Sequence, residues 1–301
     1  ITWGDSFTLA SKPFNYRIMA GIGDNTSKVT KYDNPNRTLT DPYEGQQLGE
    51  IWGYVVDGYF KTDEEARNYK VDQSFVNQMI NASALDNGLH AGDLKFVDLD
   101  GNNKIEQTTS ANDRKDMKVI GNSLPRYNYN FGISADWYGI DFSVLFQGIG
   151  KQNWYPGAET SMFWGPYSRP YASFIPSDFM SQVWSEENTN AYFPRPRGYV
   201  ALGSNRELAV VNTKYLQNLA YCRLKNLSIG YTLPDKWLSK IGFEKIRVYF
   251  SGENLLTFTK LHSDYIDPEQ ASASNSWKTS KSDANIYPWA KTYSFGVDIT
   301  F

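Results

Sequence analysis

The stretch Lys291-Thr-Tyr-Ser-Phe-Gly-Val-Asp-Ile-Thr-Phe301 decides the fold. Apolar residues occupy every second position from Tyr293 to Phe301, and small or polar residues fill the positions between them. This period of two predicts a strand with one apolar and one polar face. The stretch also has the length, roughly 9–11 residues, that a tilted strand needs to cross a bilayer. It therefore predicts the closing strand of an outer-membrane β-barrel, and the alternative is the last strand of a soluble sandwich.

The aromatic Phe301 ends this apolar stripe, although chain ends normally fray in polar residues. We therefore predict that Phe301 is an assembly signal that the barrel assembly machinery recognises.

Composition narrows the class of protein. The chain has 301 residues and a net charge of −3, so it lacks the basic field that nucleic-acid binding needs. No apolar run approaches the roughly 18 residues of a transmembrane helix, and the mean hydropathy is −0.53. A barrel with a watery lumen also has a low mean hydropathy, because only alternate residues face lipid. The 21 Tyr, 17 Phe and 9 Trp are typical both of barrel girdles and of sugar-stacking surfaces.

The cysteine content and the first residues of the chain give two further indications. Cys222 is the only cysteine, so an intrachain disulfide is impossible and a small disulfide-rich domain is excluded. The chain begins Ile1-Thr-Trp-Gly without a signal sequence, and we interpret it as a piece whose natural start lies elsewhere.

Similar alternation recurs along the chain and predicts about seven spanning strands. Besides the last strand, the predicted strands are 1–9, 14–22 (extending towards Tyr32), 127–137, 140–147, 215–232 and 246–253. Short connections follow residues 9, 138 and 232, whereas long loops fill roughly 32–126, 152–214 and 259–290. Short turns on one side and long loops on the other are typical of outer-membrane barrels, with the short side periplasmic. The C-terminus is then periplasmic, and residues 1–301 form the C-terminal portion of a barrel whose strand number is even.

Two short helices are expected inside the long loops. Thr62 and Glu65 have the spacing of a capping box, and Ser177 is the expected cap of a helix over 177–184.

Ordered motifs resemble the C-terminal part of SusC/RagA-type TonB-dependent transporters of Bacteroidetes. The matching segments are Gly53-Tyr-Val-Val-Asp-Gly-Tyr-Phe60, Gly92-Asp-Leu-Lys-Phe-Val-Asp-Leu-Asp-Gly101, Val119-Ile-Gly-Asn122, Pro125, Phe146-Gln-Gly148, Leu224-Lys-Asn-Leu-Ser-Ile-Gly-Tyr-Thr-Leu-Pro234, Ser251-Gly-Glu-Asn-Leu-Leu-Thr-Phe-Thr-Lys260, Asp267-Pro-Glu269 and Tyr287-Pro288. Lys291 stands where an Arg is common. The resemblance covers nearly the whole chain.

The resemblance implies a 22-stranded barrel in outer-membrane lipid, with an N-terminal plug domain that is absent from this chain. It also implies a SusD-like surface lipoprotein as a lid, and the TonB–ExbB–ExbD complex as energy source through the missing N-terminal part. The function expected is import of nutrient oligomers, and the motifs do not separate an oligosaccharide from a peptide ligand.

One segment predicts a structural calcium ion. Asp98-Leu-Asp-Gly-Asn-Asn-Lys-Ile-Glu106 has the spacing of a calcium loop, with Asp98, Asp100, Asn102, the Lys104 carbonyl and Glu106 as ligands. Asn103 replaces the turn glycine, and asparagine tolerates the left-handed conformation. The family pattern implies Asp113 of Asn112-Asp113-Arg114 as the last carboxylate, although four extra residues must then bulge out. The alternative is an ordinary Asp/Asn-rich turn without an ion.

Aromatic residues cluster in one external loop: Trp154, Tyr155, Phe163, Trp164, Tyr167 and Tyr171. Stacking on sugars or peptide side chains makes Trp154, Tyr155, Trp164 and Tyr167 candidates for substrate binding. Packing within the loop is the alternative for each of them.

No catalytic constellation is evident, because His90 and His262 are the only histidines and no cysteine lies near them in the sequence. We therefore expect no enzyme. The rival functions are a secreted carbohydrate-binding β-sandwich and a passive porin.

Overall fold

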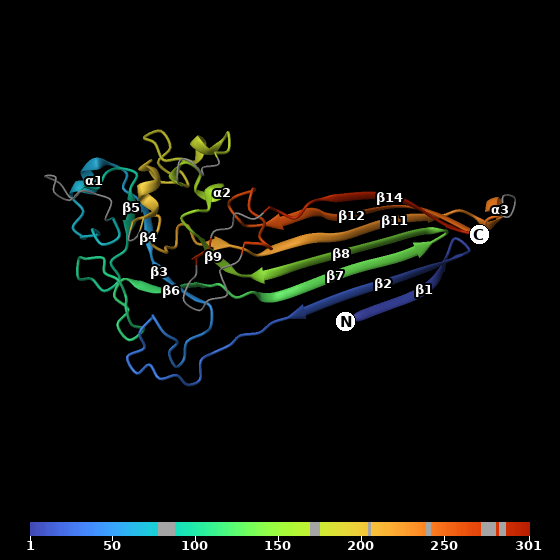
Figure 1. The fold of residues 1–301 in the computed structure, drawn as a ribbon, viewed down its shortest axis with the longest axis horizontal. Coiled ribbons are helices and arrows are strands. Elements are labelled where there is room, and N and C mark those ends of the chain that lie inside the picture. The colour runs from blue at the N-terminus through green and yellow to red at the C-terminus, as the bar shows by residue number, and fades with distance from the viewer. Residues whose placement is uncertain (78–87, 169–174, 204–205, 239–241, 272–280, 283–286) are drawn as a thin grey trace.

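A computed structural model describes residues 1–77, 88–168, 175–203, 206–238, 242–271, 281–282 and 287–301. Long strands lie side by side at one end of the molecule, and the long connections gather at the other end (Figure 1). We call the described residues of 24–125, 152–220 and 260–291 the loop body.

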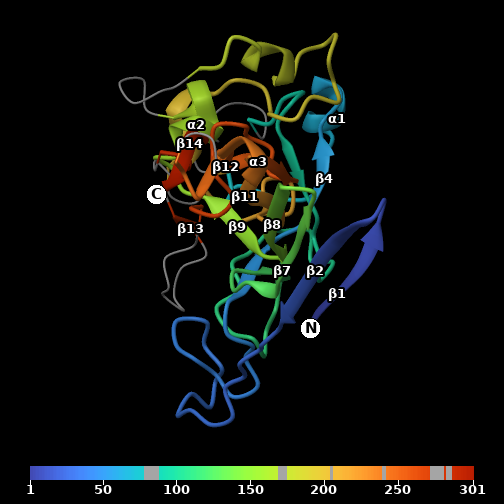
Figure 2. The same cartoon turned by 90° about the vertical axis from the view of Figure 1, so that its right-hand side faces the viewer.

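The long strands form one antiparallel sheet in the order β1-β2-β7-β8-β11-β12-β14. Their bounds are β1 Thr2–Leu9, β2 Lys12–Gly23, β7 Arg126–Trp137, β8 Ile140–Lys151, β11 Tyr221–Thr232, β12 Lys245–Thr259 and β14 Thr292–Thr300. Seen from the end, they follow one another from β14 to β1, and the two edge strands lie apart (Figure 2). The described sheet is therefore an open strip, and its mostly β content confirms the predicted fold class.

Tight turns join the strands at the end away from the loop body. Ala10 and Ser11 turn the chain between β1 and β2 with φ of 48° and 62°, and Tyr138 and Gly139 turn it between β7 and β8 with φ of 53° and 83°. Two consecutive residues with positive φ give the turn whose twist matches that of paired strands. The third connection at this end contains α3, Asp235–Leu238.

One face of the sheet is apolar from edge to edge. The strand register joins apolar side chains into rows that cross all seven strands, such as Phe7, Phe14, Trp137, Ile140, Tyr231, Val248 and Val297. Among the described residues nothing packs over this face: Ile133 remains 43% exposed and Phe295 83% exposed. The closed apolar core that a sandwich requires is thus not formed by these strands.

The opposite face is polar and built from small side chains. One row contains Arg17, Ser134, Ser143, Ser228, Ser251 and Ser294. A neighbouring ion-pair group joins three strands, because the Arg247 guanidinium contacts Asp141 at 2.7 Å and Asp298 at 3.2 Å. A water-filled lumen suits such a face. No helix in the described part of the chain is long and apolar enough to cross a membrane.

Short elements organise the loop body. They are β3 Glu50–Tyr54, β4 Val56–Tyr59, α1 Asp63–Arg67, β5 Leu94–Phe96, β6 Met117–Asn122, β9 Asn153–Pro156, α2 Ser161–Trp164, η1 Gly165–Tyr167, η2 Phe179–Gln182, η3 Gly198–Leu202, β10 Gln217–Asn218 and β13 Lys281–Ser282. Small sheets pair β3 with β6, β4 with β5, and β9 with both β10 and β13. Segments from all three long connections therefore form one packed unit.

Several predicted bounds differ from those observed. The second strand ends at Gly23 and does not extend towards Tyr32, and the predicted strand over 215–232 is divided into β10 and β11. The helix expected after Ser177 is the single 3-10 turn η2, which begins after Asp178. The Thr62 cap is present, since its hydroxyl accepts the Glu65 amide at 3.1 Å. The Glu65 carboxylate accepts the amide of Lys61 rather than that of Thr62, so the box closes one residue earlier than predicted.

Candidate functional site

The predicted calcium segment folds as a tight acidic turn. The carboxylates of Asp98, Asp100 and Asp116 each offer an oxygen, and these oxygens lie within 4.8 Å of one another. Asp98 accepts the amides of Gly101 and Asn103, both at 2.7 Å. These bonds draw the backbone around the Asp98 carboxylate and place it beside that of Asp100.

Asn103 has a φ of 62°, the left-handed conformation that its position in the turn requires. The other predicted ligands contact one another around the turn. The Asn102 side-chain amide donates to Asp100 at 3.1 Å and to Glu106 at 3.2 Å. The Lys115 ammonium lies 3.5 Å from the Glu106 carboxylate.

The buried member of the acidic turn is Asp116, which the sequence prediction missed. Its two oxygens accept the amides of Leu99 at 2.9 Å and Glu106 at 2.7 Å. Asp113, the predicted last carboxylate, is exposed and bonds through its amide to the Ser110 carbonyl, so it lies outside the cluster of three carboxylates. A turn closed by that bond lies between Ser110 and Asp113, and Asp116, three residues further on, is the carboxylate that lies beside Asp98 and Asp100.

Burial and neighbouring charges shift the pKa values of the carboxyl groups in this turn. Burial raises the pKa of Asp116, and the nearby carboxylates of Asp100 and Asp98 raise it further. Burial also opposes ionisation of Asp98, but hydrogen bonds from the Asn103 and Gly101 amides outweigh it and lower that pKa. A hard divalent cation suits such a group of oxygens, because it removes the repulsion between them.

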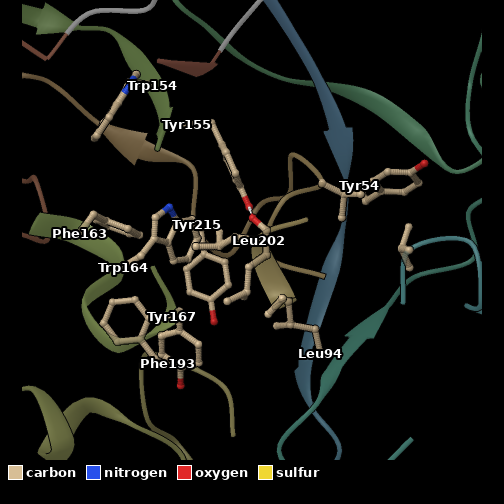
Figure 3. Packing of buried hydrophobic residues seen from close by; sticks show 14 of the residues in the cluster. Tyr54, Leu94, Trp154, Tyr155, Phe163, Trp164, Tyr167, Phe193, Leu202 and Tyr215 are labelled. Carbon is tan, nitrogen blue, oxygen red and sulfur yellow. Dashed lines mark hydrogen bonds between the residues drawn. The ribbon is translucent and has the colours of Figure 1, made fainter. Parts of the chain in front are cut away.

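The four aromatic candidates for substrate binding form the centre of the loop body. Trp154, Tyr155 and Trp164 are fully buried, and Tyr167 is 2% exposed. Their rings pack with other buried side chains from distant parts of the chain (Figure 3). A ligand cannot stack on rings that the protein covers, so the packing role replaces the substrate-binding role predicted for them. Tyr171 lies outside the described residues.

Buried polar contacts hold this aromatic core together. The Tyr155 hydroxyl donates to the Leu208 carbonyl at 2.8 Å and accepts the Asn212 side-chain amide at 2.8 Å. The Trp164 indole donates to the Gly157 carbonyl at 2.9 Å. These polar groups are thus satisfied without water, which rigidifies the loop body.

A buried charged group lies in the same unit. The guanidinium of Arg197 pairs with both oxygens of the fully buried Asp93, with a distance of 2.8 Å from Nε. Glu207 is also fully buried beside this pair, and within the described part of the chain its Oε1 has no hydrogen-bond partner. Burial and the charge of Asp93 raise the pKa of Glu207 to about 8.

The last loop is tied to the sheet by ion pairs. Arg223 of β11 is buried and contacts Asp267 at 2.7 Å and Glu269 at 2.5 Å, and Lys225 contacts Glu269 at 3.0 Å. The Asp267-Pro-Glu269 motif thus anchors residues 261–271 to the polar side of the sheet. At the other end of the molecule, the exposed ring of Phe301 lies 5.2 Å from that of Phe243, measured between centroids, and its assembly role stays a prediction.

Comparisons with known proteins place this architecture. No family model matches the chain. TonB-dependent receptor P3 of Formosa agariphila is 29% identical over 264 residues, which are 86% of this chain and 22% of that protein. TonB-dependent receptor P39 of the same organism is 25% identical over 331 residues, covering 99% of this chain and 30% of the relative.

Solved structures with the same fold cover the whole chain. The RagAB peptide importer in its open-open state matches with a TM-score of 0.64 and 19% identity, over 100% of this chain and 28% of that one. A structure of the RagAB peptide transporter matches with a TM-score of 0.61 and 18% identity, again over 28% of its chain.

The sheet with one apolar and one polar face, together with these matches, defines a segment of a transmembrane β-barrel. The chain is a relative of the TonB-dependent receptors and has the fold of the RagAB importer, in keeping with the SusC/RagA type that its motifs resemble. It spans about a quarter of the length of these proteins. These relatives are described as receptors, and the solved structures as a peptide importer and a peptide transporter.

Proposed function

We propose that this chain is part of a TonB-dependent importer that takes nutrient oligomers across the bacterial outer membrane. The observation that carries the proposal is the pair of faces of the sheet. Apolar rows cross all seven strands on one side, and serine and charged side chains occupy the other. The apolar face would contact lipid, and the polar face would line the lumen.

The loop body is the extracellular part in this proposal, and the tight turns and the C-terminus are periplasmic. A SusD-like lipoprotein would cover the loop body, and the TonB–ExbB–ExbD complex would supply energy through a plug domain. The packed aromatic core supports the docking role, because it gives a lid protein a firm surface instead of three separate loops. Two structural relatives are described as peptide importer and peptide transporter, which favours peptides over oligosaccharides as the oligomer.

We also propose that Asp98, Asp100 and Asp116 hold a calcium ion with a structural role. Asn102, Glu106 and the Lys104 carbonyl would complete the oxygen ligands. The proposal rests on the convergence of three carboxylates on one turn.

The experiment uses the complete parent protein in its native host. Deletion of its gene should abolish growth on the oligomer that it imports, with peptides and oligosaccharides supplied separately as sole carbon source. An affinity-tagged parent protein, purified in mild detergent, should carry a surface lipoprotein. Uptake that continues without TonB, by a protein that purifies alone, would instead indicate a passive porin.

A further inference from the structure

A lysine of the loop body lies between two tyrosine rings. The ammonium of Lys214 is 4.7 Å from the centroid of the Tyr59 ring and 5.7 Å from that of Tyr192. Lys214 is half-buried, and among the described residues no carboxylate lies within 4 Å of its ammonium. Its cation is thus partly removed from water, and the partners that the described residues offer it are aromatic faces.

A histidine lies beside Tyr192 on the side that faces solvent. The exposed ring of His262 stacks on Tyr192, with centroids 3.5 Å apart and an interplanar angle of 15°. His262 Nε2 lies 2.8 Å from the Gln182 side-chain oxygen. This contact uses Nε2 and does not involve Nδ1. An ammonium and an imidazole therefore lie beside the same pair of rings, Tyr59 and Tyr192, which we call the aromatic wall.

Hydrogen bonds fix the wall in place. The Tyr192 hydroxyl accepts the Gln217 side-chain amide at 2.9 Å. The Tyr192 carbonyl accepts the Tyr59 hydroxyl and, at 3.3 Å, the hydroxyl of Tyr215. The two rings beside Lys214 are therefore preorganised, and a ligand need not order them.

The charges of this region favour an anion. Burial lowers the pKa of Lys214, and no carboxylate of the described residues offsets that effect. Stacking on Tyr192 removes part of the otherwise exposed His262 ring from water, and this desolvation, with a smaller effect of the Lys214 charge, lowers the pKa of His262 against the opposing effect of Asp264. Contact with aromatic faces offsets only part of the free energy that a cation loses when it leaves water. A hydrogen-bonded carboxylate would offset the rest.

We propose that Lys214, with His262 beside it, binds a carboxylate of the imported oligomer. The inference rests on the proposed function and names the chemistry of its substrate: an acidic oligomer, whose uncharged part lies against Tyr192 and His262. The carboxylate can come from a peptide C-terminus or from an acidic sugar. Lys214 supplies the charge, and the tyrosine rings hold its side chain in position.

The test measures binding to the complete purified transporter by calorimetry with two pairs of probes. One pair is tetra-alanine with a free or an amidated C-terminus, and the other is trigalacturonate and its methyl ester. Lys214→Met keeps the length of the side chain and removes the charge, and Lys214→Arg restores the charge. The matched control is Lys118→Met, because Lys118 is exposed and makes no ion pair or ring contact in the described structure.

The wild-type transporter should prefer the acidic member of one pair, and that pair identifies the source of the carboxylate. Lys214→Met should weaken binding of the acid about tenfold, as expected for one charged hydrogen bond. It should leave the neutral member unchanged, Lys214→Arg should recover most of the loss, and Lys118→Met should have no effect.

No preference for either acid, or an equal loss for acidic and neutral members, would overturn the inference. TonB-dependent uptake of neutral oligomers would then still uphold the proposed function. Failure of uptake for every oligomer, with or without TonB, would count against the proposed function itself.

Discussion

At the scale of single residues, we predict that Glu207 makes the stability of the loop body depend on pH. Its pKa of about 8 in the folded protein lies above the ordinary value of 4.5, because burial and the charge of Asp93 oppose its ionisation. Folding therefore favours the protonated form. The stability that this form contributes is complete below pH 4.5 and is lost as the pH rises towards 8. The local unfolding free energy should fall by up to about 5 kcal/mol across this window, at about 1.4 kcal/mol per pKa unit.

The substitution Glu207→Gln should remove this dependence, because glutamine keeps the shape of the protonated side chain. Hydrogen exchange of the segments 91–97 and 206–212, corrected for intrinsic rates, measures the effect in the complete protein at pH 5 and pH 8. Glu186→Gln, at an exposed carboxylate, is the control. An identical pH slope in the wild type and in Glu207→Gln would contradict the assignment.

Gly148 occupies a position in β8 that cannot hold a larger residue. A Cβ atom built there would lie 2.1 Å from the Tyr221 carbonyl oxygen and 2.5 Å from the Tyr129 ring. The backbone oxygen belongs to the paired strand β11 and cannot move away without breaking the ladder. Gly148→Ala should therefore destabilise the barrel by about 1–3 kcal/mol.

The comparison for Gly148 is Gly23→Ala in β2, where a Cβ would meet nothing within 4 Å. The thermal transition of the folded barrel, followed by its heat-dependent migration in gels, should fall only for Gly148→Ala. Equal behaviour of the two variants would show that the space at Gly148 is not limiting.

At the scale of the element, β7 should tolerate charge on one face only. Ile133 belongs to the apolar face, and its neighbour Ser134 belongs to the serine row. A lysine on the lipid side costs about 2–4 kcal/mol near the bilayer midplane, whereas lumen positions accept charge. Ile133→Lys should thus lower the amount of folded barrel in outer-membrane fractions, and Ser134→Lys should leave it nearly unchanged. The reverse order would place the lipid on the other face.

The acidic turn should respond to calcium as a unit. Calcium at about 100 times its Kd would stabilise the folded turn by about 2.7 kcal/mol. It should therefore protect residues 98–116 from limited proteolysis in the complete protein. Asp98→Asn combined with Asp100→Asn should abolish the protection, and Asp33→Asn, at an exposed position outside the cluster, should retain it. Equal cleavage with calcium and with chelator in the wild type would refute the metal site.

The sequence predicted the long strands well because their signal is local. Alternation in β7, β8 and β14 shows which side chains share a face, and the turn at Tyr138 and Gly139 fixes the register of β7 with β8. The loops carry no such signal, since their contacts join distant segments. Tyr54, for example, pairs with Asn212 across more than half of the chain.

The candidate site shows the same limit. The spacing around Asp98 predicted the tight turn and the left-handed Asn103, because both are properties of a few neighbouring residues. It did not predict Asp116, whose place depends on the path of the intervening backbone. Nor could composition show that Trp154 and Trp164 are buried, because stacking platforms and packed cores use the same residues. The Lys214 feature joins three distant loops and has no sequence motif.

At the scale of the whole molecule, the face of the sheet that meets lipid decides how the chain is placed in the membrane. The sheet alone exposes both faces, and their chemistry assigns the apolar rows to the membrane and the serine row to the lumen. In the proposed function, the strands and the loop body have separate tasks: the sheet would provide part of the wall of the pore, and the packed loops would present a surface to a ligand and a lid protein.

Spin labels on β8 test this claim most directly. Nitroxides placed singly from 141 to 146, in the complete protein without Cys222 and reconstituted in lipid, report access to oxygen and to a water-soluble nickel complex. Labels at 142, 144 and 146 should be relaxed by oxygen, and those at 141, 143 and 145 by nickel. The same access at neighbouring positions, or apolar positions shielded from both reagents, would contradict a membrane-spanning wall.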